Sequence, residues 1–362
     1  MIKYVILIGV LIVIPFGIYF YFLLKRWVGF WKVDTTKKPV KAALIVGAIA
    51  LCATLSNFFS IWAVVLLHVV MITLITDLIN KLIKGKWWET AYRSGIITFL
   101  CTALIMGYGY WNISHIVEKD YQITTTKNLK QESYRVAFIA DVHAGENMSG
   151  ERLKEACERI QKQKPDMVIL GGDIVDEQTT KAQMEEAFAV LGSLDSTYGT
   201  YYVYGNHDRQ SYSADPLYTD KDLRQAITDN GIKPLEDETF NIDDSFLLVG
   251  RMDKGHGNDR AELTELIPEG TDDFIFVLDH QPTELMENDQ IGSDLIVSGH
   301  THAGQVWPIG LISELVGINE KNYGYEKMDN LNVIVTSGLN GWGYPVRTQG
   351  KSEFVIIDIK GE

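Results

Sequence analysis

Uncharged hydrophobic runs dominate the first third of the chain. Three of them carry no charged residue: Tyr4–Leu24, Ala42–Thr76 and Ser94–Val117. About 20 helical residues at ~1.5 Å each cross the ~30 Å hydrocarbon core of a bilayer, so the first and third runs each predict one span. The middle run has 35 residues, too many for one helix, and the polar pair Ser56 and Asn57 favours a division into two. We therefore predict four membrane helices within a transmembrane region 1–117, at about 4–24, 41–57, 59–79 and 94–117.

The pattern changes beyond this region. The segment 118–133 is polar and predicts either a short linker or a first edge strand. From residue 134 onward, short runs rich in Val, Ile and Phe are typical of buried strands, and the amphipathic stretches between them are typical of helices. The predicted strands are Arg135–Ala140, Met167–Leu170, Tyr201–Tyr204, Phe246–Val249, Phe274–Leu278, Asp294–Val297, Val333–Val335 and Phe354–Ile359, and the predicted helices are Ser149–Lys164, Thr180–Leu194 and Asp220–Asn230. Strands that alternate with helices predict an α/β domain of stacked layers over 134–362.

Basic residues predict how the chain crosses the membrane. Lys and Arg cluster in 25–41 and again in 80–93, and such clusters mark cytoplasmic loops. Two loops on the same side require an even number of spans between them, which agrees with two helices in 41–79. The fourth helix then leads outward. We predict a multi-pass protein of the cell membrane whose polar domain is extracytoplasmic.

Charge and composition exclude some classes of protein. Residues 1–120 hold 12 basic and 5 acidic side chains, whereas residues 121–362 hold 21 basic and 42 acidic ones. The whole chain has a net charge of −14. A domain this acidic is not expected to bind nucleic acid through a basic surface. The three cysteines form no Cys/His zinc pattern. His68 and Asp77 are the notable polar groups in 41–79, so the helices predict an anchor rather than a transporter.

Chemistry-bearing residues follow five of the predicted strands. The motifs are Asp141-Val-His143, Gly171-Gly-Asp173, Gly205-Asn206-His207-Asp208, Asp279-His280 and Gly299-His300-Thr-His302. They contain five of the eight histidines in the chain. Because the carboxyl ends of strands in an α/β sheet face one crevice, we expect these side chains to converge on a single site.

The residue types predict a metal site. Carboxylate, imidazole and amide ligands without thiolate suit Mn, Fe or Zn in a reactive site rather than a structural zinc site. The set is too large for one ion and suits two divalent cations ~3.5–4 Å apart, the clamp used in phosphoryl displacement. Asp173, in its Gly-Gly-Asp turn, is the candidate shared carboxylate. A water bridging the two cations would be acidified and become the nucleophile.

The five motifs, in this order, resemble those of the calcineurin-like metallophosphoesterase superfamily, and the resemblance covers about 134–362. Asp279-His280-Gln-Pro, His300-Thr-His-Ala-Gly-Gln305 and Gly343-Tyr-Pro-Val-Arg347 also look like a membrane-anchored bacterial branch of it. The resemblance implies a four-layer αββα sandwich, here preceded by the four-helix transmembrane region.

The resemblance also implies a role for each residue. Asp141, His143 and His302 should bind one metal ion, with Asp173 shared, and Asn206, His280 and His300 should complete the second. His207 resembles a histidine that does not bind metal and instead stabilises the transition state or protonates the leaving oxygen. Asp208 is a candidate to orient it, Asp176 is expected to be structural, and Arg347 is left open between a phosphate contact and a surface salt bridge.

We therefore expect a membrane-anchored phosphohydrolase that cleaves a phosphate ester or pyrophosphate bond by attack of a metal-bridging hydroxide. Monoesters, diesters and pyrophosphates all fit this clamp, and the substrate is a phosphorylated small molecule or lipid. The anchor favours a lipid-linked envelope substrate. The alternative is a non-enzymatic phosphate or phospholipid sensor with a metal-binding ectodomain, against which the complete ligand set argues.

Overall fold

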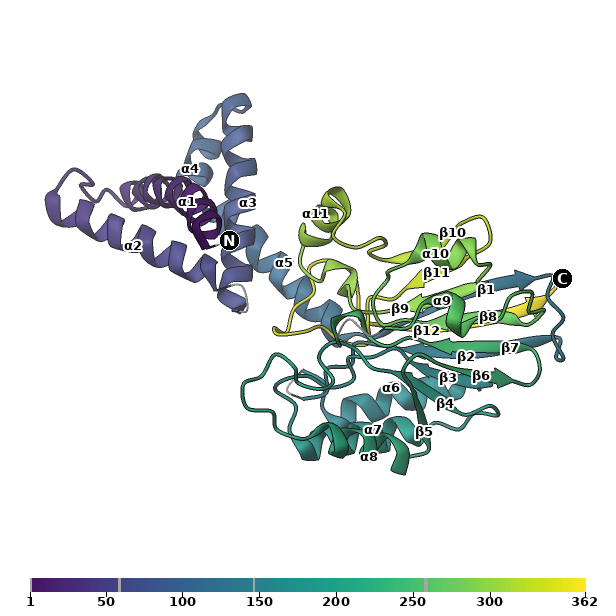
Figure 1. Ribbon diagram of the computed structural model, residues 1–362. Coiled ribbons are helices and arrows are strands. Elements are labelled where there is room, and N and C mark those ends of the chain that lie inside the picture. Colours follow the sequence, from purple (N-terminus) through teal and green to yellow (C-terminus); the bar gives the residue numbers. More distant parts are fainter. Residues whose placement is uncertain (1, 58–59, 146, 257–259) are drawn as a thin grey trace. The chain divides into compact units, whose positions relative to one another are not determined.

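The computed structural model describes residues 2–57, 60–145, 147–256 and 260–362. The chain divides into two compact units, Met1–Tyr108 and Gly109–Glu362 (Figure 1). The second unit holds all five motifs, and we call it the catalytic unit.

The N-terminal unit is helical. It contains α1 (Ile2–Phe30), α2 (Lys38–Ser56), α3 (Ile61–Leu82), α4 (Lys86–Ser94) and most of α5 (Ile96–Ser114). Within the described residues, α1, α2, α3 and α5 are long and apolar enough to cross a membrane, as the hydrophobic runs predict. The additional helix α4 has nine residues and three charges, so it does not form a long uncharged run in the sequence.

One polar cluster lies inside this helical unit. Asp77 on α3 accepts hydrogen bonds from the hydroxyl groups of Tyr19 (3.0 Å) and Tyr92 (2.9 Å) and forms an ion pair with Arg26 on α1. The guanidinium of Arg26 also lies 4.1 Å from the centre of the Tyr92 ring. A charge among apolar helices is costly unless it is paired, so this cluster compensates Asp77 and joins three helices.

The catalytic unit is built on two six-stranded sheets. Sheet A has the order β1-β12-β2-β3-β4-β5, and sheet B has the order β10-β11-β9-β8-β7-β6. The strands of sheet A are β1 (Val117–Thr125), β2 (Ser133–Ile139), β3 (Met167–Leu170), β4 (Thr200–Val203), β5 (Ile232–Leu235) and β12 (Glu353–Gly361). Those of sheet B are β6 (Glu238–Ile242), β7 (Phe246–Gly250), β8 (Phe274–Leu278), β9 (Leu295–Ser298), β10 (Gly324–Lys327) and β11 (Asn332–Val335). Strands β2 to β5 are parallel to one another, and so are β7, β8, β9 and β11.

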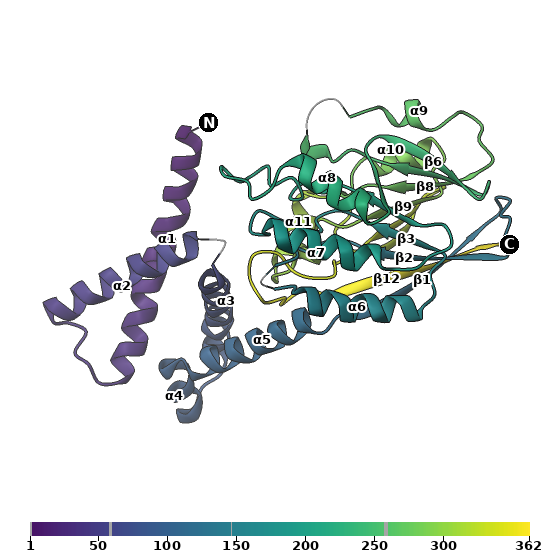
Figure 2. The ribbon, with the colours of Figure 1, turned by 90° about the horizontal axis from the view of Figure 1, so that it is seen from below.

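Three hydrophobic cores hold the layers of sheets and helices together. Alternate side chains of β2 point to opposite faces, so Val136 and Phe138 lie between the two sheets while Ala137 and Ile139 lie beneath the helices. Those helices are α6 (Gly150–Lys162), α7 (Lys181–Gly192) and α8 (Asp220–Asp229), which cover the outer face of sheet A (Figure 2). The shorter α9 (Leu263–Leu266) and α10 (Leu285–Gln290) contribute to the third core, on the outer face of sheet B. The α/β fold class and its layers are thus confirmed.

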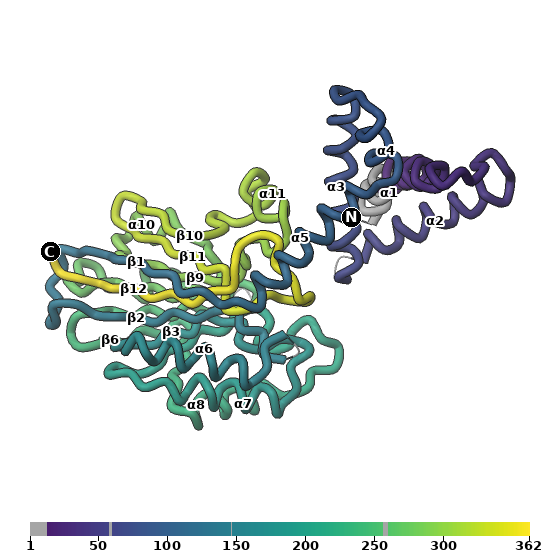
Figure 3. The backbone as a smooth tube through the Cα atoms, turned by 180° about the vertical axis from the view of Figure 1, so that it is seen from behind, coloured from purple at the N-terminus to yellow at the C-terminus, as the bar shows by residue number. Residues whose placement is uncertain are grey.

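The predicted strands and helices are found: β3 and β8 have the predicted bounds, and the ends of the others are shifted by at most two residues. Strands β1, β5, β6 and β10 are additional. Segment 118–133, for which the sequence predicts either a linker or an edge strand, contains most of β1. Strand β1 runs parallel beside β12 (Figure 3). The additional strands are polar or interrupted: β6 buries one residue of five, and β5 contains Pro234. Hydrophobic patterning is weak in such strands because much of their surface faces water.

Candidate metal centre

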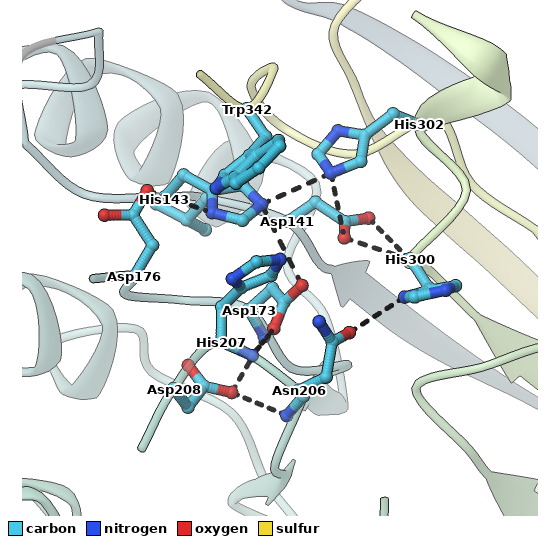
Figure 4. Close-up of polar contacts among 12 residues, drawn as sticks. Asp141, His143, Asp173, Asp176, Asn206, His207, Asp208, His300, His302 and Trp342 are labelled. Carbon is cyan, nitrogen blue, oxygen red and sulfur yellow. Dashed lines mark hydrogen bonds and ion pairs between the residues drawn. The ribbon is translucent and has the colours of Figure 1, made fainter. Parts of the chain in front are cut away.

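The five motifs meet at one end of both sheets. Asp141 and His143 follow β2, Asp173 follows β3, and Asn206 and His207 follow β4, all from sheet A. Sheet B contributes His280 after β8, and His300 and His302 after β9. Figure 4 shows the side chains that it labels gathered around a common centre. The parallel strands direct their carboxyl ends to the same edge, which is why residues so distant in sequence converge.

A first group of ligand atoms comprises Asp141, His143 and His302. The Nε2 atoms of His143 and His302 are 3.2 Å apart, and His302 Nε2 is 3.6 Å from Asp141 Oδ1. All three residues are buried or nearly so. Two imidazole nitrogens and one carboxylate oxygen this close together form a ligand set that suits a divalent cation.

A second group comprises Asp173, His280 and His300. His280 Nε2 lies 3.1 Å from Asp173 Oδ2. The side-chain oxygen of Asn206 is 3.2 Å from His280 Nε2 and 2.9 Å from His300 Nδ1, so this amide belongs to the same group. The other nitrogen of His280, Nδ1, is 2.8 Å from the carbonyl oxygen of Gly171, a contact that fixes the ring orientation.

Asp173 lies between the two groups. Its Oδ2 atom is 3.1 Å from His280 Nε2 and 3.9 Å from His143 Nε2, so one carboxylate faces a histidine of each group. Its Oδ1 atom accepts a hydrogen bond of 2.9 Å from the backbone N–H of His207. This is the position that a ligand shared by two cations must occupy.

Most of these residues have an unusual backbone conformation. Asp141, His143, Asp173, His300 and His302 all have φ between 44° and 69°, in the left-handed region that side chains with a Cβ rarely adopt. Such a conformation costs about 1–3 kcal/mol per residue and persists only where the surrounding structure imposes it. Its repetition at these residues indicates turns shaped by the site rather than by local preference.

Two glycines allow the carboxylates to lie against the backbone. A Cβ atom on Gly205 would lie 2.2 Å from Asp173 Oδ1, and one on Gly299 would lie 2.5 Å from Asp141 Oδ2. Any larger residue would displace a carboxylate from the centre, so the glycines of these motifs are needed for close approach.

The pKa shifts differ from one candidate ligand to the next. Burial raises the pKa of Asp141 to about 6. Burial opposes ionisation of Asp173 as well, but His280 holds the pKa of that carboxyl well below its usual range. Burial, with the charge of His280, lowers the pKa of His300 to about 4, and burial also lowers the pKa of His302. Burial opposes protonation of His280, but Asp173 holds the pKa of that imidazole well above its usual range. His300 and His302 thus favour the neutral form that binds metal, whereas a cation bound at His280 would have to displace its proton.

His207 is close to these groups but has different partners. Its Nδ1 atom lies 2.7 Å from Glu177 Oε2. Burial would lower the pKa of His207, but this hydrogen bond and the nearby carboxylates raise it above the ordinary value. The ring also packs between Tyr212 and Trp342, with centroid distances of 5.2 and 5.0 Å. An imidazole with a raised pKa, held by two aromatic side chains, is suited to donating a proton.

Asp208 has contacts that differ from those expected of a residue that orients His207. Its carboxylate accepts hydrogen bonds from the backbone N–H groups of Asp173, Ile174 and Gly205, at 2.6–2.8 Å. It therefore fixes the turn that carries Asp173, and Glu177 is the carboxylate that contacts His207. Glu177 was missed because no spacing rule singles it out. Its only signal in the sequence is its place four residues after Asp173 in the same turn.

The contacts of two further residues, Asp176 and Arg347, indicate what they do. Asp176 Oδ2 lies 3.2 Å from His143 Nδ1, so it orients a candidate ligand. Arg347 is fully buried, and its guanidinium donates to the carbonyl oxygens of His302 (2.7 Å), Asn340 (2.8 Å) and Ser337. Arg347 is therefore neither a surface salt bridge nor placed to contact a phosphate. It joins the loop of His302 to the segment that precedes β12.

The fold and the paired ligand groups define a metallophosphoesterase-type domain. Residues 134–304 match the family model of the calcineurin-like phosphoesterases, and the chain carries a domain of this family. The resemblance of the five motifs is thereby confirmed.

Two relatives have names that include the same domain. The chain is 29% identical over 248 residues to an uncharacterized metallophosphoesterase of Campylobacter jejuni, covering 65% of this chain and 61% of that protein. It is 26% identical over 290 residues to a zebrafish transmembrane protein with metallophosphoesterase domain, and the match covers 75% of this chain and 63% of that protein. A solved dimetal phosphatase from zebrafish is 13% identical, covers 57% of this chain and 87% of that one, and superposes with a TM-score of 0.36. The chain thus spans about three fifths of the length of the two curated relatives.

Proposed function

We propose that this protein is a membrane-anchored, two-metal phosphohydrolase that cleaves a phosphate ester or pyrophosphate bond. The observation that carries the proposal is the position of Asp173, whose Oδ2 atom faces His143 of one ligand group and His280 of the other. A single-metal or purely structural site would not need two groups that share a carboxylate.

Each residue has a part in this proposal. Asp141, His143, His302 and Asp173 would hold one cation, and Asp173, Asn206, His280 and His300 the other, with Mn, Fe or Zn suited to these donors. When bound, two divalent ions supply an acidified water as nucleophile and neutralise charge on the phosphoryl oxygens. Glu177 engages Nδ1 of His207, which leaves Nε2 to give a proton to the departing oxygen.

The membrane side is part of the same proposal. The basic clusters in 25–41 and 80–93 and the four long apolar helices support an anchor that places the catalytic unit outside the cytoplasm. Fusion of a reporter active only outside the cytoplasm to the C-terminus tests the orientation. Reporter activity is expected, and its absence together with activity of a cytoplasmic reporter would reverse the topology.

Changing Asp173 to Asn tests the two-metal assignment. The substitution keeps the shape and removes the shared charge, so we expect loss of hydrolysis and of most bound metal. The full-length protein in detergent with Mn²⁺ is assayed on a phosphomonoester, a phosphodiester and a pyrophosphate, and its metal content is measured. Asp272→Asn, in an exposed loop, is the matched control and should change neither reading.

Retained turnover with full metal content in Asp173→Asn would contradict the shared-ligand role. A wild-type protein that binds both metals and cleaves none of the three substrate classes would instead favour the sensor.

A further inference from the structure

Helix α11 (Ile309–Val316) turns its large apolar side chains outward. Its buried residues are small, Gly310 and Ser313. Seven exposed apolar side chains form what we call the apolar ridge: Trp307, Ile309, Leu311, Ile312, Leu315, Val316 and Ile318. A helix on a water-soluble domain directs its apolar stripe to the core, so α11 has the opposite arrangement. Contiguous exposed apolar surface of this kind marks an interaction site.

The ridge is attached to the metal centre. A Cβ atom on Gly310 would lie 2.8 Å from the carbonyl oxygen of Ala303 and 2.3 Å from Gln349 Nε2. Gly310 therefore packs directly on the turn that carries His302. The position of α11 and the position of this candidate ligand are mechanically linked.

The ridge also begins beside the end of a membrane helix. The backbone N–H of Trp307 donates to Thr348 Oγ1 at 3.0 Å, and the Thr348 methyl group would lie 3.0 Å from a Cβ on Gly109 of α5. The N–H of Arg347 donates to the carbonyl oxygen of Gly109 at 2.9 Å. Tyr110 and Trp111, next along α5, are exposed aromatics of the type found where a helix leaves the hydrocarbon.

We propose that the apolar ridge inserts into the interfacial layer of the bilayer that α5 crosses, and that it holds the metal centre at headgroup level to act on phosphate groups of membrane lipids. The choice of a bilayer as occupant rests on continuity, because Thr348 contacts both the backbone of Trp307 and Gly109 of α5. Two attachments, one spanning and one interfacial, would also fix the orientation of the domain. The substrate class rests on the proposed hydrolase function, whereas the membrane contact does not.

Depth measurement tests the contact. A nitroxide is attached at Leu315→Cys in full-length protein, with Cys52 and Cys101 changed to Ala, in vesicles of phosphatidylethanolamine and phosphatidylglycerol. Leu315 is 76% exposed, and Met286 on α10, which is 66% exposed, provides the matched control as Met286→Cys. We expect the label at 315 to collide with oxygen and to be shielded from a water-soluble nickel complex, and the label at 286 to behave as in water.

Activity tests the substrate class. The probes are phosphatidic acid and a polyprenyl pyrophosphate in the same vesicles, beside soluble p-nitrophenyl phosphate and bis-p-nitrophenyl phosphate. Leu315→Asp should lower cleavage of the lipid probes by about tenfold or more and leave the soluble probes within about twofold, because a charge on the ridge opposes insertion. Met286→Asp should change neither.

The outcomes separate the two proposals. A label at 315 that is as accessible to nickel as the label at 286 overturns the ridge, even if the soluble esters are cleaved. Spin–spin coupling between labels at 315 that persists in detergent would assign the ridge to a second copy of the chain and also overturns it. If the ridge inserts and the metal content is full but no probe is cleaved, the membrane contact is supported and the proposed hydrolase function is contradicted. Equal loss on lipid and soluble probes would overturn the lipid-substrate class.

Discussion

His207 owes its setting to three neighbours rather than to its own motif. Glu177 engages one ring nitrogen, while Tyr212 and Trp342 confine the ring. The histidine was identifiable from Gly205-Asn206-His207, because that motif carries its chemistry in consecutive residues. Glu177 and Trp342 were not, because each comes from another turn and only the fold brings them to His207.

His207→Ala should retain both metals and lose activity in proportion to the need for a proton. We expect a fall of ~10²–10⁴ in kcat on an alkyl phosphate, whose leaving alkoxide must be protonated, and a much smaller fall on p-nitrophenyl phosphate. Glu177→Gln should show the same dependence on leaving group with a smaller loss. Glu265→Gln, on exposed helix α9, serves as control. A loss that is equal for both leaving groups, or loss of metal, would remove the assignment of His207 as proton donor.

The elements divide into those that patterning reveals and those that it does not. Strands β3 and β8 have the predicted bounds because each is buried on both faces and forms an unbroken apolar run. Edge strands such as β6 and β10 lack that run, since most of their side chains meet water. The segment between β11 and β12 is missed for another reason. Its structure depends on the buried side chain of Arg347, whose guanidinium donates hydrogen bonds to carbonyl groups of two separate turns.

Replacing Arg347 by Lys keeps the charge and removes the planar fork that reaches three carbonyl oxygens. Buried carbonyl groups left unsatisfied cost about 1–3 kcal/mol each, so we expect the free energy of unfolding of the catalytic unit to fall by about 2–4 kcal/mol. Because one of these carbonyls belongs to His302, affinity for the first metal should fall as well. Denaturant titration and metal content provide the two measurements. Arg224→Lys, more than half exposed, should leave both unchanged, and an unaltered Arg347→Lys protein would show that the contacts are dispensable.

At the scale of the molecule, the position of β1 makes the end of the membrane region part of the enzyme fold. The carbonyl of Asn112 accepts from Ser352 N–H, the hydroxyl of Ser352 donates to the carbonyl of Ile113, and β1 pairs with the whole of β12. Hydropathy predicted a boundary after residue 133 because 118–133 is polar. A polar sequence shows only that side chains face water. An edge strand can expose such side chains while its backbone is still hydrogen-bonded to the neighbouring strand, as β1 is to β12.

Two truncated proteins test this boundary. A protein of residues 109–362 keeps β1 and should be monodisperse in detergent, whereas one of residues 134–362 exposes the full edge of β12. We expect the shorter protein to aggregate or to melt several degrees lower, because an unpaired long edge strand recruits other chains. Size-exclusion chromatography and thermal melts compare them. Equal behaviour of the two would place β1 outside the cooperative fold.

The place of β12 has a consequence for biosynthesis. This strand lies between β1 and β2 in sheet A, yet it is synthesised after every other strand of both sheets. Sheet A therefore cannot close while the ribosome is still extending the preceding segments, and the domain emerges as an unfinished chain. An export channel accepts chains in that state. The strand order would thus delay closure of sheet A until the end of synthesis, which would suit the extracytoplasmic position that we propose for this domain.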